Sequence, residues 1–124
     1  MKINQIFLLV SALLVTFSFS TAQAQSDIKI PFMLAQGQKL FNENCSSCHN
    51  VDLSGVDDRG PPLLHPYYKP SHHGDEAFYK AALNGTRAHH WKFGDMPAIK
   101  GMTRKKMDSI IPYVRYFQKQ KKLY

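Results

Sequence analysis

The sequence predicts a single all-α domain with long loops. Residues 33–44, 75–84 and 103–117 carry helical signals, and no stretch alternates convincingly between polar and apolar residues as a strand would. The chain has 124 residues and only two cysteines, which suits one modest domain but not a scaffold held by several disulfides. The fold must therefore be held by its core, by one bridge or by a bound group.

The first predicted helix follows Pro31. Its apolar and small residues recur at helical spacing along one face: Met33, Gly37, Leu40, Phe41 and Asn44. Gly37 costs about 1 kcal/mol relative to alanine inside a helix. We therefore expect another element of the fold to approach the backbone closely at this glycine.

Residues 50–74 are rich in proline and glycine and should be irregular. A second, short helix is predicted over 75–84, because two acidic residues begin it and Gly85 can adopt the positive φ of a helix end. The third helix begins after Thr103, a good capping residue. Its apolar repeat is Met107, Ile110, Ile111, Val114 and Phe117. Pro112 removes one hydrogen bond from this helix and should bend it.

The first 24 residues have the features of a secretory signal. Lys2 supplies a positive start, residues 6–19 are uncharged and largely apolar, and residues 22–24 form an A-x-A cleavage site. The apolar stretch is shorter than the ~20 residues that span a bilayer, although a retained anchor is the alternative. We expect cleavage near Ala24, export to the periplasm and no stable membrane insertion afterwards. Residues 25–31 would then be an N-terminal extension.

The formal charge of the chain is +7, and removal of Lys2 with the signal leaves +6. Such a charge favours encounters with acidic partners, or it simply keeps a small protein soluble. The most basic stretches are residues 104–106 and a C-terminal tail, residues 119–124. The lysines and the arginine in them are Arg104, Lys105, Lys106, Lys119, Lys121 and Lys122.

The two cysteines lie in the motif C-x-x-C-H, formed by Cys45, Cys48 and His49. This is the attachment sequence for c-type haem. Two thiols one helical turn apart can add to the two vinyl groups of haem, and the adjacent imidazole reaches the iron from the same side. A redox C-x-x-C pair or a tight disulfide is the alternative, but neither would require His49. We therefore expect one haem c, attached through two thioethers.

In its order of motifs the chain resembles the class I monohaem cytochrome c family over residues 32–118. After C-x-x-C-H come a G-P-x-L element at residues 60–63, an M-P pair at Met96 and Pro97, and a C-terminal helix. The resemblance implies a cytochrome c domain at 32–118. Its fold would consist of three main helices with long loops wrapped around one covalently bound haem.

The resemblance also implies roles for individual residues. The carbonyl of Pro61 would accept the Nδ1 proton of His49 and fix its orientation. Met96 would supply the second metal ligand of the iron, with Met102 as an alternative, and Trp91 would donate to a haem propionate. The first and last helices of the family cross near the haem edge. Here Gly37 and Phe41 would meet Ile110 and Tyr113.

Ligation by His49 and Met96 would leave no open position on the iron, and a thioether ligand favours Fe(II). The expected function is therefore one-electron transport between periplasmic or membrane redox proteins with acidic docking surfaces. We expect a carrier and not an enzyme, without catalytic residues, small-molecule substrate or nucleic-acid partner. The alternatives are an electron-entry subunit of a larger oxidoreductase, a peroxidase after loss of Met96, and a haem-based sensor.

Five further histidines lie between the haem motif and the M-P pair: His65, His72, His73, His89 and His90. The two adjacent pairs would suit copper or zinc if they met in space, and a histidine could also replace Met96 on the iron. Neighbouring residues on an extended chain point in opposite directions. We therefore favour a structural or haem-edge role for these histidines over a second metal site.

Overall fold

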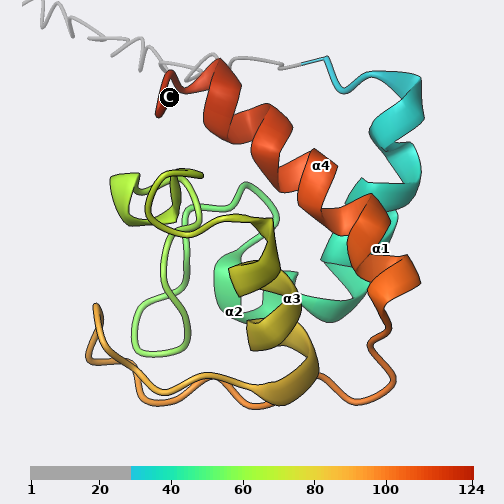
Figure 1. Cartoon of the computed structure of the whole chain (residues 1–124). Coiled ribbons are helices and arrows are strands. Elements are labelled where there is room, and N and C mark those ends of the chain that lie inside the picture. The colour runs from blue at the N-terminus through green and yellow to red at the C-terminus, as the bar shows by residue number, and fades with distance from the viewer. Residues whose placement is uncertain (1–28) are drawn as a thin grey trace, which may run out of the picture.

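The computed structural model describes residues 29–124, which form four α-helices. These are α1 (Ala35–Asn44), α2 (Ser46–His49), α3 (Asp75–Asn84) and α4 (Arg104–Gln120), with 3-10 turns η1 (Phe32–Leu34) and η2 (Pro66–Tyr68). Figure 1 shows α4 crossing α1, while two long loops extend from α2 to α3 and from α3 to α4. Over the described part of the chain, β-structure is limited to two isolated bridges. The predicted all-α fold is confirmed.

The three predicted helices are all present. α3 has the predicted bounds, and the chain leaves it at Gly85 with a φ of 77°. The Thr103 side chain caps α4 by accepting a hydrogen bond from the backbone N–H of Lys106. α4 continues through Pro112, which lies on its exposed side, and ends at Gln120. The first two residues of the predicted basic tail therefore belong to this helix.

Two short elements, α2 and η2, fall outside the helices that the sequence predicts. The predicted signal, its cleavage site and most of the extension at 25–31 lie outside the described residues. Among residues 29–124, no helix is long and apolar enough to cross a membrane.

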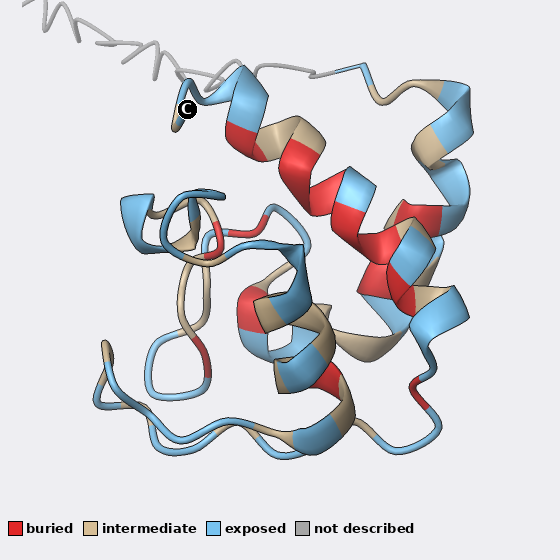
Figure 2. Cartoon of the chain, viewed as in Figure 1, coloured by how far each residue is buried: buried red, intermediate tan, exposed pale blue. Residues whose placement is uncertain are grey.

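The core centres on the crossing of α1 and α4. Figure 2 shows buried residues along much of α4 and in the part of α1 that it crosses. The rings of Phe41 and Tyr113 are both buried, with their centroids 5.5 Å apart. Gly37 is buried at the same crossing, where a Cβ atom would overlap the carbonyl oxygen of Ser109. The close approach predicted at Gly37 is confirmed.

Replacement of Gly37 by alanine should destabilise the protein, although alanine is the better helix former. Overpacking of this kind typically costs about 1–3 kcal/mol, which exceeds the gain of about 1 kcal/mol in helix propensity. Denaturant unfolding of the haem-loaded protein measures the change. Gln36→Ala is the matched control, because it adds alanine at an exposed neighbouring position of α1 and should leave the stability unchanged or slightly raised. An unchanged or raised stability of Gly37→Ala would contradict the crossing geometry.

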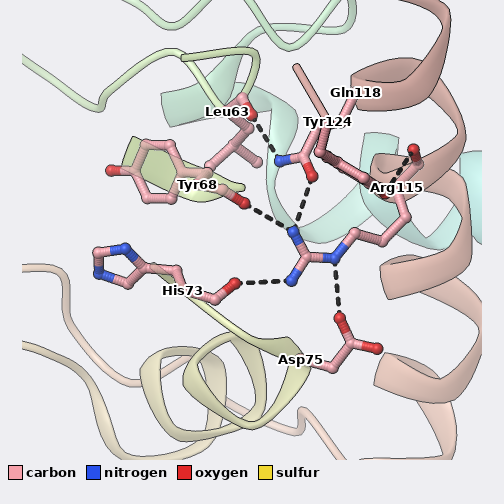
Figure 3. Close-up of polar contacts among 7 residues, drawn as sticks. All are labelled: Leu63, Tyr68, His73, Asp75, Arg115, Gln118 and Tyr124. Carbon is pink, nitrogen blue, oxygen red and sulfur yellow. Dashed lines mark hydrogen bonds and ion pairs between the residues drawn. The ribbon is translucent and has the colours of Figure 1, made fainter. Parts of the chain in front are cut away.

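A buried arginine ties the loop after α2 to α4. The Arg115 guanidinium donates to the carbonyl oxygens of Tyr68 at 2.6 Å and His73 at 2.7 Å. It also donates to Asp75 at 2.8 Å and to the Gln118 side chain at 2.8 Å (Figure 3). Hydrogen bonds of a charged donor are worth about 1.5–3 kcal/mol each. Arg115 thus fixes the backbone of a loop that has little regular structure of its own.

Candidate haem site

A cavity of about 540 Å³ lies between the helices and the two long loops. Much of its wall is apolar, with Phe41, Phe78, Ile110 and Val114 among the lining residues. All six residues predicted for the haem site line it: Cys45, Cys48, His49, Pro61, Trp91 and Met96. Residues that are up to 51 positions apart in the sequence thus converge on one cavity.

Both cysteines line the cavity. Cys45 lies between α1 and α2, and Cys48 lies within α2. The backbone N–H of His49 donates to the Cys45 carbonyl at 2.9 Å, so one helical turn brings the three motif residues together. Burial, and to a smaller extent the neighbouring Cys48, raises the pKa of the Cys45 thiol to about 12. Redox-active C-x-x-C pairs have lowered thiol pKa values. The Cys45 thiol thus lacks the lowered pKa of an activated thiol, and the adjacent His49 is the residue that the redox alternative does not require.

The imidazole of His49 is buried and held in one orientation. Its Nδ1 atom lies 2.9 Å from the carbonyl oxygen of Pro61, to which a protonated Nδ1 would donate, leaving the Nε2 lone pair free. Burial lowers the pKa of His49, and the hydrogen bond to Pro61 opposes this shift. A neutral imidazole with a free Nε2 is the form that binds iron.

Gly60 allows the Pro61 carbonyl to reach His49. A Cβ atom on Gly60 would lie 2.6 Å from the carbonyl oxygen of Cys48. Any larger residue would therefore push the loop away from α2, and the Pro61 carbonyl with it. This close contact explains why the G-P-x-L element has glycine at its first position.

Met96 is held against the end of α3. Its backbone N–H and carbonyl exchange hydrogen bonds with those of Thr86, both at 2.9 Å. Met102, the alternative ligand, is instead buried in the hydrophobic core and does not line the cavity. The geometry therefore favours Met96 as the residue that faces a bound haem.

The indole of Trp91 donates to the hydroxyl of Tyr68 at 3.1 Å. Tyr68 also lines the cavity, so the indole N–H and the phenol hydroxyl form a hydrogen-bonded polar pair in its wall. The contact of Trp91 with a haem propionate stays a prediction.

Three exposed basic residues line the cavity: Arg59, Lys80 and Arg87. The one acidic residue in the described lining, Asp95, accepts a hydrogen bond from the backbone N–H of Ala88 at 2.9 Å. We call Arg59, Lys80 and Arg87 the basic rim. Sequence reasoning missed it, because three basic residues in three separate segments form no cluster along the chain.

The basic stretch predicted at 104–106 is partly engaged within the protein. Arg104 forms an ion pair with Glu76 at 3.0 Å, and Lys106 donates to the Gly101 carbonyl at 2.8 Å. Neither residue lines the cavity. The basic rim is therefore closer to the candidate haem site than the stretch that the sequence singled out.

The side chains of His72 and His73 are not arranged as the sequence predicted. His72 and His73 lie in a turn and not on an extended chain, and the Nδ1 atoms of both approach the carbonyl of Tyr67. His73, His89 and His90 line the cavity. The premise that adjacent histidines point apart is wrong for His72 and His73.

The fold and the site define an all-α domain with a haem attachment motif in the wall of an apolar cavity. The family model described as Cytochrome c matches residues 34–118. The chain therefore belongs to the cytochrome c family. Membership implies a covalently bound haem c, and the donor set gathered in the cavity fits that group.

Relatives share a short region with this chain. The cytochrome bc1 complex cytochrome c subunit of Corynebacterium efficiens is 42% identical over 43 residues, which is 35% of this chain and 14% of that protein. The subunit of the same name from Mycobacterium tuberculosis is 42% identical over 41 residues, 33% of this chain and 15% of the relative. The chain thus spans only about a seventh of the length of these relatives. No solved structure matches it significantly.

Proposed function

We propose that the protein is an exported one-electron carrier with one haem c whose iron is ligated by His49 and Met96. The observation that carries this proposal is the convergence of the C-x-x-C-H motif, Pro61 and Met96 on a single cavity. A bound haem supplies reversible one-electron chemistry at its iron.

The residues of the chain then hold and tune this group. Cys45 and Cys48 anchor it, and the Pro61 carbonyl keeps His49 in the orientation and tautomer that ligation needs. The apolar wall limits the access of water to the cavity. With Met96 as the second ligand, no position is left for oxygen or peroxide, which favours a carrier over an enzyme.

The proposed location is the periplasm, after removal of a signal near Ala24. The composition of residues 1–24 supports this proposal. In the mature protein the basic rim would be the contact surface for redox proteins with acidic docking surfaces. Charge complementarity of this kind raises association rates by about 10- to 1,000-fold at low salt.

Electron exchange with small charged reagents tests both parts of the proposal. The reduced protein should give one electron per chain to ferricyanide, an anion. In Lys80→Glu/Arg87→Glu this reaction should slow by about 10-fold or more at low salt, and the difference should shrink near 1 M salt. Oxidation by a cationic cobalt complex should become faster instead. Stopped-flow absorption measures these rates.

Lys121→Glu/Lys122→Glu is the matched control, because it changes the net charge equally at two exposed residues outside the cavity lining. It should have a much smaller effect on the rate with ferricyanide. Equal slowing by the two double variants would show that total charge matters and the basic rim does not. A chain that exchanges no electron would contradict the carrier function itself.

The names of the relatives favour a second candidate, a haem subunit of a larger oxidoreductase. Native electrophoresis of whole source cells, gently solubilised so that periplasmic and membrane proteins are both retained, separates the two. A carrier migrates alone as a small haem-staining band, whereas a subunit migrates with a large complex.

A further inference from the structure

We propose that His72, His73 and His90 form a binding site for one divalent transition-metal ion, separate from the haem iron. One ring nitrogen of each residue lies within 4.8 Å of the others. Imidazole nitrogen is a preferred ligand of Zn²⁺ and Cu²⁺. The site would be of the three-histidine kind, with a further position open to water.

A tight turn brings the first two ligands together. The backbone N–H groups of His72 and His73 both donate to the carbonyl of Lys69, at 3.0 and 2.9 Å. The two Nδ1 atoms consequently lie 2.9 Å from each other, and 2.8 and 2.6 Å from the carbonyl oxygen of Tyr67. Two nitrogens bound to one zinc ion at about 2.0–2.1 Å lie ~3 Å apart. The spacing of the turn therefore suits a shared ion.

The two ring nitrogens of His73 contact different neighbours. Its Nδ1 atom lies 2.6 Å from the carbonyl oxygen of Tyr67, and its Nε2 atom lies 3.3 Å from Nε2 of His89. His89 Nδ1 lies 2.9 Å from the Arg87 carbonyl, so it carries the proton of a neutral His89, whose Nε2 atom is an acceptor. With a proton on Nε2, His73 would donate to His89 and offer the lone pair of Nδ1 to an ion.

One proton on a neutral His73 cannot serve both of its contacts. The Tyr67 carbonyl oxygen at 2.6 Å from Nδ1 and His89 Nε2 at 3.3 Å from Nε2 are both acceptors. A metal ion bound at Nδ1 of His72 and His73 would place positive charge beside the Tyr67 oxygen and leave the Nε2 proton of His73 for His89. The contact from His73 to His89 then matches the usual outer hydrogen bond of a metal-bound histidine.

His90 provides the third ligand. Within residues 29–124, its Nε2 atom is buried and has no hydrogen-bond partner. Its ring stacks on that of Tyr67 with centroids 4.3 Å apart, and lies 5.0 Å from the ring of His72 and 5.2 Å from that of His73. A buried nitrogen without a partner is costly, and coordination of an ion would remove this cost.

Arg115 holds the turn in place from the other side. Figure 3 shows the His73 carbonyl directed at the guanidinium while the imidazole of His73 points away from it. Asp75 pairs with the arginine at 2.8 Å and offsets its charge. His72 is exposed, so an ion can reach the site from solvent.

If the protein carries haem as proposed, the metal site would affect the reduction potential of the haem. His73 and His90 line the cavity that would hold the haem. A divalent ion beside it would favour the reduced iron and raise the reduction potential of the haem.

Zinc titration of the haem-loaded full chain, in competition with a chromophoric chelator, tests the proposal. The wild type should bind one Zn²⁺. His73→Gln/His90→Gln should bind it at least about 100-fold more weakly, since even outer partners of a metal ligand contribute ~10–100-fold. His65→Gln is the matched control, because it removes an imidazole outside the group of three and should leave the affinity unchanged. An unaltered haem spectrum in each variant confirms that it is folded.

Three outcomes would overturn the metal site. The wild type would bind no zinc, the double variant would bind it as tightly as the wild type, or the double variant would show an altered axial-ligand spectrum before zinc is added. The last result would assign these imidazoles to the haem iron. Zinc binding without a rise in potential would overturn only the coupling to the haem.

Discussion

Cys45→Ala/Cys48→Ala should lose covalent haem and, with it, most of the folded structure. The cavity of about 540 Å³ lies within a domain of fewer than 100 described residues. At about 24 cal/mol per Å³, a void of this size would cost on the order of 10 kcal/mol. Entry of water reduces this cost, but the typical stability of a domain is only about 5–15 kcal/mol. We therefore expect the haem to act as a central part of the core.

Haem staining after denaturing electrophoresis measures covalent attachment, and far-ultraviolet circular dichroism measures the fold. Ser46→Ala/Ser47→Ala is the matched control, because it changes the two residues between the cysteines and leaves both thiols in place. The control should stain and fold as the wild type does. A double cysteine variant that keeps haem through denaturation, or that folds fully without haem, would contradict this account.

Met96→Ala should change the iron centre more than the fold. Loss of the thioether should abolish the weak sulfur-to-iron charge-transfer band of the oxidised protein. It should also lower the reduction potential and let the reduced protein bind carbon monoxide. Thr86 holds the loop through backbone hydrogen bonds only, so the truncated side chain should leave the loop in place. Absorption spectroscopy of both redox states follows these changes.

Met102→Ala, only six residues away, should change the stability of the fold and leave the iron ligands intact. Met102 is 8% exposed and belongs to the hydrophobic core, so its truncation should lower the free energy of unfolding by about 2–5 kcal/mol. The charge-transfer band should remain. If Met102→Ala removed the band and Met96→Ala retained it, the assignment of the second ligand would be reversed.

The sequence predicted what local patterns determine. α3 was predicted with its observed bounds, because two acidic residues begin it and Gly85 ends it. α4 was predicted from its apolar repeat and from the cap at Thr103. The C-x-x-C-H motif is informative for the same reason, since its chemistry depends on residues within one helical turn. Gly37 was explained correctly because an unfavourable helix residue implies a close contact.

The sequence could not predict features that depend on long-range packing. Arg115 lies outside the apolar repeat of α4, and its partners Tyr68, His73 and Asp75 are at least 40 positions away. The basic rim joins three segments that only the folded chain brings together. The premise that His72 and His73 point in opposite directions was wrong because it assumed an extended chain, whereas the backbone N–H groups of both residues donate to the Lys69 carbonyl in a turn.

The absorption spectrum of the purified protein in both redox states, recorded with and without carbon monoxide, tests the central claim most directly. A covalent haem ligated by His49 and Met96 should give a c-type spectrum, a sulfur-to-iron band in the oxidised form and no change in the reduced form on addition of carbon monoxide. A spectrum without covalent haem would contradict the cofactor. A reduced protein that binds carbon monoxide would contradict ligation by His49 and Met96, and with it the function as a simple electron carrier.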